Sequence, residues 1–198
     1  MKELILIRHG RTDANDRRLY CGASDLPLSP SGREALEKLQ KEREYPDVTG
    51  YSVFTSGMLR TEETLEILYG TVEHRVLPEL REVDFGAFEL RGYEELKDDP
   101  AFQRWCEGDN EKNVPPGGES GEGMTLRVIR ALADLLEEYD RLLIVGHGGP
   151  IAAMMDRLFP AEGKNRWQWQ PRNGEGYHVV LCDSPRWEII PKGDAADG

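Results

Sequence analysis

Histidine and arginine side chains follow aliphatic runs at widely separated places in this chain. The run LILI leads into Arg8 and His9, and the run LLIV leads through one glycine into His147. Arg60 comes shortly after a third run, YSVF, which favours β-structure. A neutral imidazole is a competent nucleophile near neutral pH, and guanidinium groups neutralise the charge of phosphate oxygens. Together these residue types suit chemistry on a phosphoryl group.

Each of these residues also has a plainer interpretation. A single histidine at a strand end is more often a hydrogen-bonded structural residue, and Arg60 alone would more often be a solvated helix residue. The recurrence of strand, histidine and glycine at two places favours a shared site. The alternative chemistry is a metal site formed by His9, His147 and a carboxylate. Two neighbouring arginines would repel a divalent cation, so the sequence predicts no metal ligands and implies no cofactor.

The elements that must position these residues alternate between strands and helices. Strands are predicted at residues 4–7, 51–54, 76–77, 142–145, 177–182 and 187–190. Helices are predicted before Pro46 and at residues 58–69, 93–96, 100–105, about 120–139 and 150–159. Residues 15–30 are predicted as a loop, with Ser31 as the N-cap of the next helix and Glu34 completing a capping box.

This alternation predicts an α/β fold, a three-layer α/β/α sandwich with a mainly parallel sheet. In such a sheet the ligand site lies beyond the carboxyl ends of the strands. The segments that carry Arg8, His9, Arg60 and His147 should therefore open on one edge and line one crevice.

Length and charge limit the possible partners. The chain suits one domain over residues 1–198, with an excursion at residues 90–118 and a disordered tail at 193–198. With 25 basic and 37 acidic side chains the formal net charge is −12, which opposes binding to nucleic acid or to a membrane surface. Three well-separated cysteines and an N-terminal apolar run too short for a signal peptide favour a cytoplasmic location. The sequence leaves the oligomeric state open.

Six ordered segments resemble the signature of the histidine phosphatase superfamily, also called phosphoglycerate mutase-like. RHGRTDAN at residues 8–15 is similar to the RHGxTxxN motif. The other five are DLPLSPSG at 25–32, TSGMLRT at 55–61, LREVDFGAFE at 80–89, PGGES at 116–120 and VGHGG at 145–149. PGGES is similar to the corresponding segment of the family's small phosphatase branch, which includes α-ribazole phosphatase and broad-specificity phosphatases.

The resemblance implies a role for each matching residue. His9 would attack phosphorus and become a phosphohistidine, while Arg8, Arg60 and His147 bind the phosphoryl oxygens. Asn15 and Gly148 would add polar contacts to the substrate. Glu82 would protonate the leaving alkoxide and then activate the hydrolytic water. Position alone does not separate Glu82 from Asp84 or Glu89.

The resemblance leads us to expect a phosphatase that acts on a small phosphorylated substrate. A cofactor-dependent phosphoglycerate mutase and a non-catalytic phospho-ligand binder are the alternatives. Substrate choice would reside in the 90–118 excursion, which would cap the substrate, and in the loop around Cys21. Trp105, Trp167, Trp169 and Tyr93 could line a pocket for an organic leaving group, but packing in the core or on the surface is the expected role of each. The physiological substrate stays open.

Overall fold

The computed structural model describes residues 1–109 and 111–192, so the predicted tail at 193–198 lies outside the described part of the chain. Its centre is a six-stranded sheet in the order β3-β2-β4-β1-β5-β6. The parallel strands are β1 (Lys2–Arg8), β2 (Ser52–Thr55), β3 (Arg75–Val76) and β4 (Arg141–Gly146). The antiparallel strands are β5 (Gly176–Leu181), which pairs with β1, and β6 (Arg186–Ile190). The predicted mainly parallel sheet is confirmed, with two antiparallel strands added at one edge.

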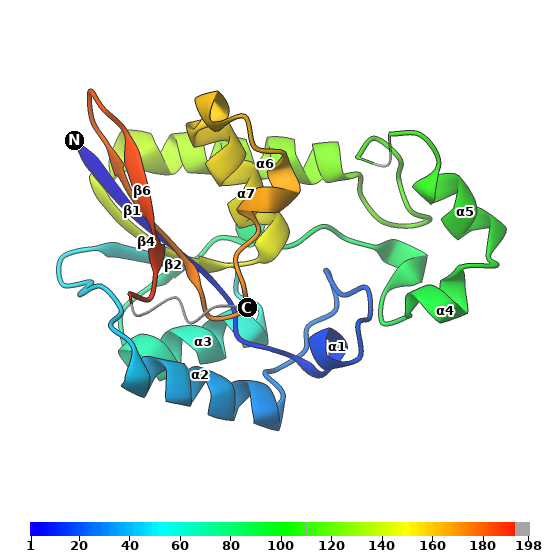
Figure 1. The fold of residues 1–198 in the computed structure, drawn as a ribbon, viewed down its shortest axis with the longest axis horizontal. Coiled ribbons are helices and arrows are strands. Elements are labelled where there is room, and N and C mark those ends of the chain that lie inside the picture. Colours follow the sequence, from blue (N-terminus) through cyan, green and yellow to red (C-terminus); the bar gives the residue numbers. More distant parts are fainter. Residues whose placement is uncertain (110, 193–198) are drawn as a thin grey trace.

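Helices cover both faces of this sheet (Figure 1). α2 (Pro30–Glu42) and α3 (Leu59–Tyr69) lie on one face, and α6 (Gly121–Glu138) and α7 (Gly148–Leu158) lie on the other. Alternate side chains of β1 serve the two cores: Leu4 and Leu6 pack with α6 and α7, whereas Ile5 and Ile7 pack with α2 and α3. The aliphatic run that precedes His9 is therefore buried on both sides, and it holds that residue rigidly.

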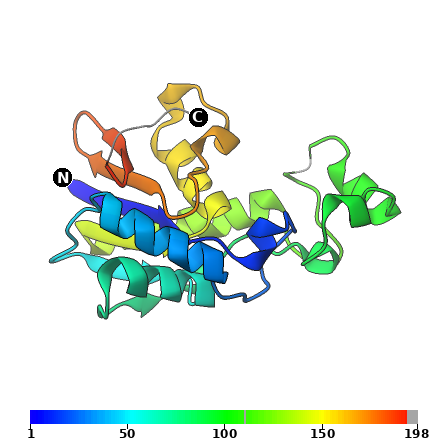
Figure 2. The ribbon, with the colours of Figure 1, turned by 60° about the horizontal axis from the view of Figure 1, so that its bottom comes forward.

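The excursion lies beyond the end of the sheet, where α4 (Tyr93–Leu96) and α5 (Pro100–Cys106) project away from the layers (Figure 2). Its own small core is built on Phe88, Leu96 and Phe102. The remaining short elements are helix α1 (Asp13–Asp16) and the 3₁₀ turns Pro78–Leu80, Gly86–Phe88, Pro160–Glu162 and Arg166–Trp169.

Two local predictions are wrong. The N-cap of α2 is Ser29, whose hydroxyl accepts from the Gly32 N–H at 3.1 Å. Pro30 then occupies the first helical position, where its missing N–H costs nothing, so the helix begins before the predicted cap at Ser31. The predicted loop at 15–30 also overlaps α1, a single turn capped by Thr12.

Candidate active site

Three neighbouring strand ends bring the predicted residues together. In the register of the parallel strands Arg8 lies opposite Gly146, and Thr55 lies opposite Val145. The His9 N–H donates to the Gly146 carbonyl at 2.9 Å. As a result the His9 and His147 rings meet edge to face, with centroids 5.2 Å apart.

The ring of His9 is held in one tautomer. Its Nδ1 lies 2.6 Å from the carbonyl oxygen of Gly10, and because a carbonyl oxygen can only accept, Nδ1 carries the proton. The lone pair is then on Nε2. Burial, followed by the charges of Arg60 and Arg8, holds the pKa of His9 well below 6.5. His9 is therefore a neutral imidazole whose lone pair lies on Nε2.

The guanidinium of Arg60 is buried and fully oriented. Its two terminal nitrogens donate to the carbonyls of Gly22 and Ser24 at 2.7 and 2.8 Å, and its Nε donates to Nδ1 of His147 at 3.3 Å. The carboxylate of Glu89 in turn accepts the backbone N–H groups of residues 22–24 at 2.9–3.1 Å. Glu89 thus organises the loop that holds Arg60.

The second arginine, Arg8, donates from one terminal nitrogen to the Pro171 carbonyl at 2.9 Å. Its Nε is buried and has no hydrogen-bond partner among the described residues. A buried N–H group of a cation without a partner is costly, and Arg8 also lines the adjacent pocket.

Of the three acidic residues left open by the sequence, Glu82 is the one placed on the pocket among the described residues. Its Oε2 accepts from the Gly149 N–H and its Oε1 from the Val83 N–H, both at 3.0 Å. Asp84 instead accepts from the Gly86 N–H at 2.8 Å, and Glu89 is occupied by its loop. Of these three carboxylates, Glu82 is therefore the one positioned to meet a molecule in the pocket.

The two remaining predicted residues differ in position. Asn15 lines the pocket, and its Oδ1 accepts from the N–H of Thr12 at 3.0 Å. Gly148 is the first residue of α7 and is buried; a Cβ added there would lie 2.3 Å from Nε2 of Gln170. Gly149, which sequence reasoning did not single out, is the glycine of this pair that lines the pocket.

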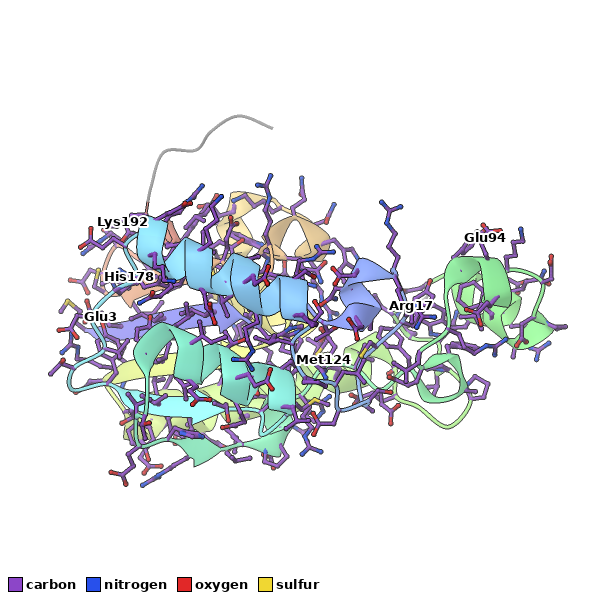
Figure 3. All side chains as sticks on the ribbon, turned by 90° about the horizontal axis from the view of Figure 1, so that it is seen from below. Glu3, Arg17, Glu94, Met124, His178 and Lys192 are labelled. Carbon is purple, nitrogen blue, oxygen red and sulfur yellow. The ribbon has the colours of Figure 1, made fainter. Side chains whose placement is uncertain are left out.

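The pocket is a cavity of about 430 Å³ between the sheet and the excursion. Arg8, Asn15, Glu82 and Gly149 form part of its wall, whereas His9, Arg60 and His147 are buried and are not among the residues that line it. Met124 also lines it, and Figure 3 places Met124 between Glu3 and His178 at one end and Glu94 on the excursion at the other.

Aromatic side chains also line the pocket. They include Tyr20, Phe85, Trp105 and Trp167. The expectation that Trp105 and Trp167 would not line a pocket is therefore wrong, because α5 and the turn after α7 both face this cavity. Trp169 is a core residue, 1% exposed, and Tyr93 lies on the surface, 60% exposed, as expected.

Sequence reasoning missed three roles. Glu89 organises the loop that holds Arg60, the N–H of Gly149 donates to Glu82, and the hydroxyl of Ser56 contacts the ring of His147. Ser56 Oγ lies 2.8 Å from Nε2 of His147. All three residues stand inside the motif segments, so the signal was present, but only the tertiary contacts give their roles.

Within the described residues, no helix combines the length and the apolar character required to span a bilayer.

Comparison with known proteins shows the family to which this chain belongs. Residues 4–193 match the model of the histidine phosphatase superfamily (branch 1). The adenosylcobalamin/α-ribazole phosphatase of Salmonella typhimurium is 30% identical over 189 residues, which cover 91% of each chain. Phosphoglycerate mutase-like protein 4 of Arabidopsis thaliana is 28% identical over 98% of this chain and 86% of its own. The crystal structure of the α-ribazole phosphatase from Shigella flexneri superposes with a TM-score of 0.82, at 29% identity and 96% coverage of both chains.

Proposed function

Because this chain belongs to the histidine phosphatase superfamily, we propose that it hydrolyses small phosphomonoesters through a phosphohistidine on His9. The observation that carries the proposal is the state of His9. Its Nδ1 proton is engaged by the Gly10 carbonyl, so the lone pair of Nε2 is available beside Arg8 and Arg60. A nucleophile and two fixed cations are the parts that phosphoryl transfer requires.

In the first step Nε2 of His9 attacks phosphorus, a P–N bond forms, and the ester P–O bond breaks. Arg8 and Arg60 neutralise the charge on the phosphoryl oxygens, and Glu82 gives its proton to the departing alkoxide. In the second step water attacks phosphorus, Glu82 takes up the proton of that water, and the P–N bond breaks. Inorganic phosphate leaves, and both side chains return to their starting states.

The aromatic part of the pocket supports a substrate with a flat apolar leaving group. Tyr20, Phe85 and Trp105 would contact the leaving alcohol, with the excursion at 90–118 capping it. Because two of the compared proteins are named α-ribazole phosphatases, α-ribazole phosphate is the first substrate to test.

Mutase activity is the second candidate, supported by the similarity to phosphoglycerate mutase-like protein 4. Both reactions share the phosphohistidine, and they differ in whether water or a second alcohol accepts the phosphoryl group. Interconversion of 2- and 3-phosphoglycerate that depends on added bisphosphoglycerate would identify a mutase, whereas release of inorganic phosphate without that dependence would identify a phosphatase.

The proposal is tested by trapping the phosphoenzyme. Protein mixed with ³²P-labelled phosphoester and quenched in alkali should carry label that acid removes, as expected for phosphohistidine. His9→Ala should lose both the label and turnover of p-nitrophenyl phosphate. His178→Ala is the matched control, because His178 lies on β5 and pairs with Glu188. Turnover that survives in His9→Ala would refute the mechanism, and phosphate binding without turnover of any phosphoester would identify a binder.

A further inference from the structure

A row of hydroxyl groups lies behind the ring of His147. Nε2 of His147 is 2.8 Å from Oγ of Ser56, and that oxygen is 3.1 Å from Oγ1 of Thr61. The Thr61 hydroxyl lies 2.7 Å from the carbonyl oxygen of Met58. Ser56, Thr61 and His147 are all buried, so solvent does not compete for these hydrogen bonds.

The final carbonyl fixes the direction of every bond in this row. The Met58 oxygen can only accept, so the single proton of the Thr61 hydroxyl is donated to it. Oγ1 of Thr61 must then accept the proton of Ser56. Since that proton is used, Oγ of Ser56 must accept from Nε2–H of His147. The row therefore runs from imidazole to serine, threonine and carbonyl.

Arg60 contacts the other nitrogen of the His147 ring, Nδ1, and favours the same tautomer. Its Nε–H points at Nδ1 of His147 over 3.3 Å, so Nδ1 must hold a lone pair. The opposite tautomer would place two N–H groups face to face at Arg60. It would also leave Ser56 and Thr61 with lone pairs facing each other, at a cost that buried polar groups avoid.

From these contacts we infer that Ser56 and Thr61 are positioning residues that hold His147 as its Nε2–H tautomer. Nδ1 is consequently the atom at which His147 takes up a proton when a phosphoryl dianion enters the site. The first statement concerns the free protein, and the second rests on the proposed function. In the bound state the 3.3 Å hydrogen bond from Nε of Arg60 to Nδ1 must break, so that Nδ1–H and the Arg60 guanidinium both donate to the anion instead.

The charges around His147 explain why binding of a dianion would be linked to protonation of the ring. Burial, then the charge of Arg60, holds the pKa of His147 well below 6.5 in the free protein. A dianion adds opposite charge beside the ring and favours the protonated form. The charges that act on His147 are those of Arg60 on α3, Arg8 and His9 at the end of β1, and Arg127 on α6. The carboxylate of Glu82 is bound nearby, to the N–H of Gly149.

The test is ¹⁵N NMR of the histidine rings in the full-length protein at pH 7. In the free protein Nε2 of His147 should be protonated and Nδ1 should not, and saturating inorganic phosphate should protonate both. Ser56→Ala and Thr61→Val should mix the two tautomers and lower kcat by roughly 5- to 100-fold, the range for a buried group left without a partner. Thr61→Ser restores the hydroxyl and should restore both readings.

Thr125→Val is the matched control, since the Thr125 hydroxyl also donates to a backbone carbonyl within a helix, at 2.8 Å, without contacting His147. A proton on Nδ1 in the free wild-type protein would overturn the inference, as would an unchanged tautomer in Thr61→Val. These results are independent of turnover. If the protein shows the predicted tautomer but hydrolyses no phosphoester, the proposed function and the proton uptake that rests on it are wrong. The positioning role of Ser56 and Thr61 would still stand.

Discussion

Gly149 is the residue at which the position of Glu82 can be changed while Glu82 itself is kept. Its N–H donates to Oε2 of Glu82 at 3.0 Å. A Cβ added at Gly149 would lie 2.3 Å from Oε1 of Glu82 and 3.2 Å from Cε of Met124. Because no methyl group fits at the first distance, Gly149→Ala is expected to push the carboxylate away from this N–H.

The size of the effect follows from the hydrogen bond that is lost. A hydrogen bond to a charged group contributes about 1.5–3 kcal/mol, which corresponds to a fall in kcat/KM of about 10- to 150-fold. This fall is expected for an alkyl phosphate, whose alkoxide needs a proton as it leaves. For p-nitrophenyl phosphate kcat/KM should fall much less, because nitrophenolate leaves without a proton. Its kcat should still fall, since in the proposed mechanism Glu82 also activates the water of the second step.

Gly123→Ala is the control for this variant. Gly123 lies in the first turn of α6, and a Cβ added there would meet only Oγ of Ser120, at 3.2 Å. Its kcat/KM should match the wild type for both substrates, and thermal unfolding would show that both variants are folded. Equal losses for the two substrates in Gly149→Ala would contradict proton donation by Glu82. Unchanged rates would show that the position of Glu82 does not matter.

Three further predictions concern the cations, the loop and pH. Arg60→Ala should lower kcat/KM by at least ~100-fold, because one preorganised charge contact contributes ~3 kcal/mol. Steady-state kinetics measures this loss, and a near-normal rate would mean that Arg60 does not bind substrate. Glu89→Gln should lower the free energy of unfolding in urea by about 1–3 kcal/mol, since its carboxylate accepts the N–H groups of residues 22–24; unchanged unfolding would mean that this loop is ordered without Glu89. Burial, then Arg60, lowers the pKa of both His9 and His147, so the unfolded chain binds protons first as pH falls. The free energy of unfolding should therefore decrease below pH ~6.5 by up to ~1.4 kcal/mol per pH unit for each histidine, and a His9→Gln/His147→Gln protein that kept this slope would contradict the assignment.

The layered fold could be predicted because its signals are local. The buried strands at residues 4–7 and 142–145 are aliphatic throughout, and the alternation with helices requires a parallel sheet. Boundaries set by competing signals were harder. Ser29 and Ser31 are both good helix caps, and the choice between them depended on Pro30, which suits the first helical position.

The site could be predicted as a set of residues but not as a network. His9, Arg60 and His147 could be placed together because parallel strands end at one sheet edge. The resemblance singled out Glu82, but position in the sequence did not separate it from Glu89, and the contact of Glu89 with residues 22–24 could not be predicted. Contacts across the fold separate them: Glu82 meets the start of α7, and Glu89 meets residues 22–24.

Burial, together with Arg60 and Arg8, lowers the pKa of His9. This keeps its imidazole unprotonated, but it also makes the folded protein less stable at low pH. A histidine near an anion usually gains a proton, and a protonated His9 would have no lone pair for phosphorus. Burial and the charges of Arg60 and Arg8 work against that proton, so His9 is neutral in the free protein although the net charge of the chain is −12. Because the same guanidinium groups attract the phosphoryl oxygens, substrate binding and a neutral nucleophile have one electrostatic cause. Replacing either arginine with a neutral residue should therefore raise the pKa of His9 as well as weaken phosphate binding, and this shift separates their electrostatic role from a purely steric one.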